Sequence, residues 1–178
     1  MGWSNSTLFI LKEKQKPKDF VTKLIEQLKT IGWRLALKEE FVYFNDSAVS
    51  EEEKEPIYFE EELSEQEIID LLVSWKGLGG LVFFALDFEF PVSIDFLSWD
   101  DVSIEGFCIG FNGKDKILLY EREKHKNIIY KISEFVNFKL VVGNVEDYSY
   151  HYDLSTILQK AKENHFEILI TDRENEQK

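Results

Sequence analysis

Residues 64–90 read SEQEIIDLLVSWKGLGGLVFFALDFEF, and the spacing of apolar residues changes within this single stretch. Ile68, Leu71, Leu72 and Trp75 recur every three or four residues, which is the spacing of one face of a helix. From Leu81 onward the side chains alternate with a period of two, which is typical of a strand. The stretch therefore predicts a helix followed closely by an extended strand, and a fold that contains both.

The beginning of this helix carries a strong local signal. Ser64 and Glu67 match the capping box, in which the hydroxyl accepts from the backbone N–H three residues on and the carboxylate reaches back to the N–H of the cap. Gly77, Gly79 and Gly80 end the periodic pattern. We expect a helix over residues 64–76.

Three further helices are expected, over about residues 17–31, 127–136 and 154–164. Pro17 suits a first helical turn, where its missing N–H is not needed. Asn127 and Asp153 stand where caps of the last two helices would lie. Residues 138–142 have the composition of a strand, although the helix before them can also continue through this segment.

A meander of about four antiparallel strands is predicted over residues 81–121. Its first strand runs to Phe90 and places Asp87 and Glu89 on one face. Asn112-Gly113 lies between two apolar runs and predicts a type I′ hairpin whose return strand covers residues 116–120. The fold class is α+β, a single domain over residues 1–178 with a largely antiparallel (mixed) sheet and three to four helices. We expect an exposed acidic loop over residues 45–56 and a frayed tail over residues 172–178.

Composition and charge exclude several classes of protein. The chain of 178 residues is 44% hydrophobic and 15% aromatic, too rich in apolar side chains for a disordered protein. A net charge of -13 disfavours nucleic-acid binding and adsorption to anionic membranes. No apolar run approaches the ~20 residues of a membrane span. We expect a cytoplasmic protein without a cofactor, and the sequence contains no phosphate-binding or nucleophile motif that would indicate an enzyme.

The negative charge is concentrated in residues 39–75. Thirteen of the 34 acidic residues and only one of the 21 basic residues, Lys54, lie there, which leaves 21 acids and 20 bases elsewhere. Aromatic residues interrupt the acids, and a second acidic segment rich in tyrosine follows after residue 145. Charges speed the encounter with a basic protein and aromatic side chains hold the complex. The predicted partner-binding residues are Phe41, Tyr43, Phe44, Tyr58, Phe59, Glu60, Glu61, Glu62, Glu65, Glu146, Asp147, Tyr148, Tyr150 and Tyr152.

An alternative site would use carboxylates of the meander. Asp87 and Glu89 lie two residues apart on the predicted strand, and Asp95 lies on the next one. Such acids can bind a divalent cation or act as a hydrolytic acid–base pair. The same pattern is also typical of the solvated face of an antiparallel sheet.

The chain resembles the small acidic α+β immunity proteins that protect bacteria from polymorphic or contact-dependent toxins. The likeness lies in its size, its acidity, the meander entered at Gly79-Gly80, and the helix, strand, acidic-tyrosine segment and helix over residues 127–164. The resemblance implies a non-enzymatic inhibitor that binds a basic cognate toxin, such as a nuclease. A metal-binding or hydrolytic enzyme and an adaptor subunit of a larger assembly are the alternatives, and the oligomeric state stays open.

Overall fold

The computed structural model of the chain describes residues 3–37, 41–44, 57–58, 60–74, 79–86, 88–113, 122–145, 153–163 and 167–171. The predicted loop over residues 45–56 and the tail over 172–178 lie outside these ranges. The helices are α1 (Pro17–Thr30), α2 (Glu65–Val73), α4 (Arg122–Ser133) and α5 (Leu154–Lys162). The strands are β1 (Trp3–Gln15), β2 (Trp33–Leu35), β3 (Phe41–Phe44), β4 (Ile57–Tyr58), β5 (Gly79–Ala85), β6 (Val92–Leu97), β7 (Ile104–Gly113), β8 (Phe138–Val145) and β9 (Glu167–Thr171).

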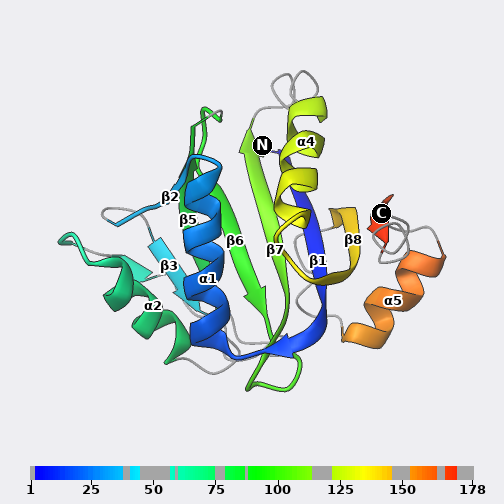
Figure 1. Ribbon diagram of the computed structural model, residues 1–178, viewed down its shortest axis with the longest axis horizontal. Helices are drawn as coiled ribbons and strands as arrows, with labels where there is room; N and C mark the ends of the chain where they lie inside the picture. Colours follow the sequence, from blue (N-terminus) through cyan, green and yellow to red (C-terminus); the bar gives the residue numbers. More distant parts are fainter. Residues whose placement is uncertain are drawn as a thin grey trace.

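The described strands form one sheet in the order β4-β3-β5-β6-β7-β1-β8-β9, with β2 also paired to β5. Every pairing among them is antiparallel. Figure 1 shows α1 and α4 in front of this sheet, with β6 and β7 visible between them and α2 on the outer side of α1. The predicted α+β class with a largely antiparallel sheet is therefore confirmed.

The N-terminal strand β1 lies in the middle of the sheet. Residues 3–10 of β1 pair with residues 106–113 of β7 along one edge, and its other edge pairs with β8. Asn112 and Gly113 are opposite Ser4 and Trp3, so the predicted hairpin turn is wrong. The return strand predicted over residues 116–120 lies outside the described residues.

The strand β5 ends earlier than predicted. It stops at Ala85, and Leu86 lies in a turn with 82% of its surface exposed. The N–H of Phe88 donates to the Ala85 carbonyl at 3.1 Å, which closes this turn. The expected strand through residue 90 is therefore wrong. Pro91 precedes β6, as suits a residue that cannot donate to a neighbouring strand.

Two clusters of buried side chains lie on opposite faces of the sheet. The larger packs α1, α2 and α4 against one face and includes Phe9, Phe83, Phe107 and Ile109. The smaller packs Ile157 and Ala161 of α5 against the other face, where it meets the following residues of the sheet: Leu8, Ile10, Leu97, Cys108 and Val142. Both clusters contain residues of β1, because alternate side chains of a strand point to opposite faces.

The helix predictions hold where local caps are strong. Pro17 stands in the first turn of α1, and the Asp153 carboxylate accepts from the Thr156 N–H at 2.7 Å at the start of α5. The predicted cap at Asn127 is wrong, because α4 begins at Arg122. His125, one turn before Ile128 and Ile129, stacks on Phe111 at 4.5 Å between ring centroids, so the buried face begins before Asn127. The open alternative at residues 138–142 is settled as strand β8.

Asp100 organises the connection from β6 to β7. Its Oδ1 accepts from the N–H groups of Ser103 and Val102 at 2.7 and 2.9 Å, and its Oδ2 from Lys14 Nζ at 3.1 Å. Burial by itself would raise the pKa of Asp100, but these hydrogen bonds and one from Ser98 hold the pKa well below its usual 3.8. The contact with Lys14 ties this connection to the end of β1.

Gly106 and Gly110 stand where neighbouring chains approach β7 closely. A methyl group on Gly106 would lie 2.8 Å from the Phe9 carbonyl oxygen, and one on Gly110 would lie 2.6 Å from Ser93 Oγ. The first obstacle is backbone of the paired strand β1, whereas the second is a side chain that can rotate. Gly110 should therefore tolerate an added methyl group better than Gly106.

We predict that Gly106→Ala lowers the free energy of unfolding by about 1–3 kcal/mol, because β1 must shift to accommodate the methyl group. Gly110→Ala is the matched control and should have a smaller effect. Urea denaturation of both variants measures the difference. A stabilised Gly106→Ala variant would contradict the close approach of β1 and β7.

The register of β1 can be tested through Cys108, the only cysteine of the chain. Leu8 is its partner in β1, and directly opposed residues have Cβ atoms about 4.5–5.5 Å apart, close to what a disulfide requires. Leu8→Cys should therefore form an intrachain disulfide under oxidising conditions, detected by thiol titration and mass spectrometry. Thr7→Cys, whose partner is Ile109 and whose side chain points to the other face, should keep both thiols. Two free thiols in oxidised Leu8→Cys would argue against this register.

Candidate functional site

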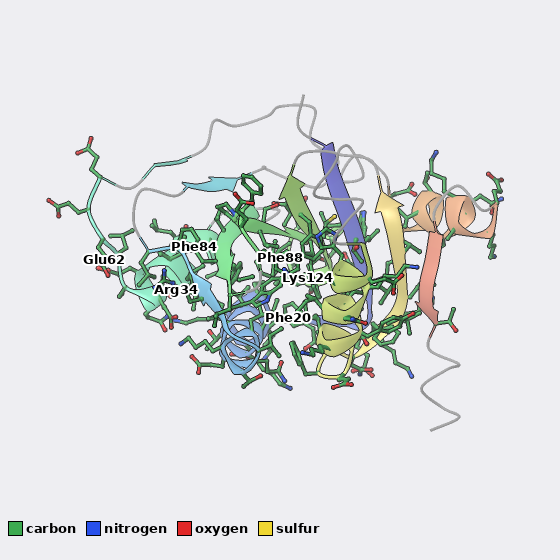
Figure 2. The ribbon with its side chains drawn as sticks, turned by 90° about the horizontal axis from the view of Figure 1, so that it is seen from above. Phe20, Arg34, Glu62, Phe84, Phe88 and Lys124 are labelled. Carbon is green, nitrogen blue, oxygen red and sulfur yellow. The ribbon has the colours of Figure 1, made fainter. Side chains whose placement is uncertain are left out.

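The described part of the predicted acidic segment forms one surface at an end of the molecule. We call it the acidic surface and define it by Glu60, Glu61 and Glu62 before α2, and by the following residues of α2: Glu65, Glu67, Asp70 and Leu71. Figure 1 shows α2 at the outer side of the helical layer, and Figure 2 shows Glu62 directed away from the body of the protein. All three glutamates before α2 are exposed.

The run of three glutamates is held at both ends. Before it, β4 pairs with β3, with Tyr58 opposite Phe41. After it, the N–H of Leu63 donates to the Leu37 carbonyl at 3.1 Å, and the Leu63 side chain packs against the larger core. The three glutamates thus span a short distance between two attached points, which keeps their charges together on one side of the protein.

The capping box predicted at Ser64 is confirmed. The Glu67 N–H donates to Ser64 Oγ at 3.2 Å, and the Ser64 N–H donates to Glu67 Oε2 at 2.8 Å. The hydrogen bond from the Ser64 backbone, followed by that with its side chain, lowers the pKa of Glu67 below its usual 4.5. Ile68, Ile69 and Leu72 are buried against the core, so α2 presents its acids from a packed helix.

Lysines of α1 neutralise part of the acidic surface. Lys29 Nζ lies 2.8 Å from Glu65 Oε2 and 2.9 Å from Glu26 Oε1, and Lys18 Nζ lies 3.0 Å from Asp70 Oδ1. The hydrogen bond from Lys18, with a second from Gln66, lowers the pKa of Asp70. The hydrogen bonds to Glu65 and Glu26 raise the pKa of Lys29.

Glu60, Glu61 and Glu62 differ from the acids of α2 in this respect. Within the described ranges, no ion pair or hydrogen bond joins their side chains to another residue. Unlike Glu65 and Asp70, they therefore have no described cation that another molecule would have to displace. Sequence reasoning found these three residues, but missed the lysines of α1, although Lys18 and Lys29 stand eleven residues apart on one face of the predicted helix.

Leu71 supplies an exposed apolar side chain among the acids of α2. The sequence pattern placed it on the core face of the helix with Ile68 and Leu72, and this placement is wrong, since 37% of Leu71 is exposed. It lies next to Asp70 and one turn from Glu67. An apolar side chain ringed by charges is a common arrangement at the centre of a protein interface.

The structure describes only part of the predicted aromatic component. Phe41, Tyr43 and Phe44 lie in β3 and Tyr58 in β4, and the backbone pairing brings both strands to the same edge of the sheet. Tyr43 and Phe44 are opposite Gly80 and Gly79 of β5. The remaining predicted residues lie outside the described ranges and stay a prediction: Phe59, Glu146, Asp147, Tyr148, Tyr150 and Tyr152.

The structure describes two of the three carboxylates of the alternative site. Glu89 is exposed in the connection from β5 to β6, whereas Asp95 is 7% exposed in β6, between Gly80 and Cys108 of its neighbours. Glu89 therefore does not stand on a strand beside β6. Across the residues that the structure describes, no group of three His, Cys, Asp or Glu side chains is arranged to hold a metal ion. Asp87 lies outside them, so the full trio stays untested.

The structure also contains contacts of aromatic rings that the sequence did not predict. Phe88, in the connection after β5, lies 5.2 Å from the His125 ring and 5.3 Å from the Phe111 ring, with Lys124 Nζ 4.8 Å from its centroid. Figure 2 shows Phe88 and Lys124 close together. On the other face of the sheet, the Arg34 guanidinium lies 5.4 Å from the Phe84 ring. Such contacts depend on pairing between distant segments, for which a single sequence carries no signal.

No helix among the described residues is both long enough and apolar enough to cross a membrane. No protein-family model, curated protein or solved structure matches the chain.

We predict that Ser64→Ala lowers the free energy of unfolding by about 0.5–2 kcal/mol, because the N–H of Glu67 loses its acceptor. Ser64→Asp is the matched control, since an aspartate can also cap a helix, and it should retain most of the stability. Thermal or urea unfolding measures both variants. If Ser64→Ala were as stable as the parent protein, the cap would not be needed to hold α2.

Proposed function

We propose that this protein is a non-enzymatic inhibitor that binds a basic protein partner on its acidic surface. In the most specific form of this proposal it is an immunity-type protein of the cytoplasm, and the partner is a cognate toxin with a basic active-site cleft, such as a nuclease. The proposal concerns binding and requires no chemical step by this chain.

The observation that carries the proposal is the state of Glu60, Glu61 and Glu62. Three adjacent carboxylates are exposed, make no ion pair with a described residue, and are held between β4 and the anchored Leu63. Placing three like charges side by side costs stability through their repulsion. A cationic partner would relieve that repulsion, so this arrangement of charges supports a role in binding such a partner.

Leu71 supports the same proposal. Charges at the edge of an interface mainly raise the rate of encounter, whereas a desolvated apolar side chain slows dissociation. The acidic surface offers both kinds of group on one side of the molecule. The exposed glutamates would thus attract the partner, and Leu71 would lie within the contact.

The test begins with capture of a partner from native lysate on the immobilised protein. For the partner so identified, we predict that Glu60→Lys, Glu61→Lys and Glu62→Lys together slow association at low salt by roughly tenfold or more. They should also weaken its dependence on ionic strength. Stopped-flow fluorescence or surface plasmon resonance measures both quantities.

A matched control makes the same change in net charge elsewhere. Glu13, Glu123 and Glu134 are exposed, and they belong to β1, α4 and the turn after α4, outside the acidic surface. Their combined replacement by lysine should affect association much less than the change at the acidic surface. Equal effects of the two triple variants would show that only net charge matters, and would contradict a binding site at this position.

A further inference from the structure

The ion pairs between α1 and α2 suggest how binding at the acidic surface is limited. Glu65 and Asp70 each already contact a cation, because the ammonium groups of Lys29 and Lys18 lie 2.8 and 3.0 Å from their carboxylate oxygens. Both lysines belong to α1, whereas Glu65 and Asp70 belong to α2. A basic partner that approaches this surface therefore meets two carboxylates that are occupied.

We propose that Lys18 and Lys29 are internal competitors that set the affinity of the acidic surface for cationic partners. This inference rests on the proposed function. A lysine or arginine of the partner can contact Glu65 or Asp70 fully only when the internal ammonium group gives up its place. Lys18, Asp70 and Lys29 are exposed and Glu65 is half-buried, so exchange requires only side-chain rotation and leaves α1 and α2 in position.

Lys18 and Lys29 lie on the face of α1 that is turned to α2, whereas Lys23, the third lysine of this helix, makes no ion pair with α2. Residues 18, 22, 25 and 29 lie along one face of a helix, since successive members are three or four residues apart. That face is turned to α2, as the contacts of Lys18 and Lys29 show. Lys23 lies on the same helix, is exposed, and has no hydrogen bond or ion pair with a described residue. Lys23 therefore carries the same charge without competing.

The competing contacts also explain why the acidic surface has two parts. Glu60, Glu61 and Glu62 have no internal cation among the described residues and act over a distance. Glu65 and Asp70 contribute only after exchange, when the partner is already near. Compared with removal of Lys23, which changes the total charge equally, removal of Lys18 or Lys29 should therefore raise affinity mainly by slowing dissociation, because attraction at long range depends on the total charge.

The experiment compares Lys29→Met, Lys18→Met and the control Lys23→Met in the full chain. The probe is a fluorescent oligolysine peptide, and fluorescence anisotropy measures its affinity and its dissociation rate. We expect Lys29→Met and Lys18→Met each to bind the peptide about two- to fivefold more tightly than Lys23→Met, which is the range expected when one exposed ion pair is removed. All three variants lose one positive charge, so a difference among them does not come from net charge. Circular dichroism confirms that each variant is folded.

Two other outcomes have definite meanings. If the peptide binds the parent protein and the Glu60, Glu61 and Glu62 charge reversal abolishes this binding, but the three lysine variants bind alike, the competition is refuted and the proposed function stands. If the peptide fails to bind the parent protein at low salt, the proposed function fails and the competition fails with it.

Discussion

The backbone pairing of β1 on both of its edges is the interaction on which the rest of the structure depends. β1 lies between β7 and β8 and pairs with both. It therefore joins the part of the sheet from β4 to β7 to the part formed by β8 and β9. Phe9 contributes to the core under α1 and α4, and Leu8 and Ile10 contribute to the core under α5. Residues from the start of the chain pair with residues about a hundred positions later, and such contacts form only after long loops have closed.

This arrangement explains which features could be read from the sequence. The beginnings of α1, α2 and α5 were predicted because Pro17, Ser64 with Glu67, and Asp153 act on backbone groups within one turn. Most strands were recognised from their alternation. The partners of these strands were not recognised, because Asn112-Gly113 carries the local signal of a hairpin turn, whereas the structure pairs these two residues with the beginning of β1. The false cap at Asn127 has a similar origin, since the packing of His125 on Phe111 extends α4 beyond the local signal.

In the candidate site, too, the features that depend on neighbouring residues were predicted from the sequence, and those that depend on packing between distant segments were not. A run of three glutamates before a capped helix is visible in the sequence, and the structure places all three at the surface. That Leu71 is exposed, and that Lys18 and Lys29 contact the acids of α2, depends on how α2 lies against α1. The position of Glu89 in a connection, and not on a strand, likewise depends on where β5 ends, which is set by the turn at Leu86.

The position of α2 is determined by packing, and this matters for how the acidic surface can work. Exposed ion pairs contribute little to stability because water competes for both partners. Ile68, Ile69 and Leu72 are buried, and the hydrogen bond of Leu63 with Leu37 holds the segment before the helix. The internal lysines can therefore leave the acids of α2 without moving the helix. Because the acids are already held in place, a partner need not order them on binding, which lowers the entropic cost of association. In the proposed complex, the charges would act within about a Debye length, roughly 8 Å in physiological salt, and would guide the last step of the encounter. Leu71 would then contribute to the lifetime of that complex.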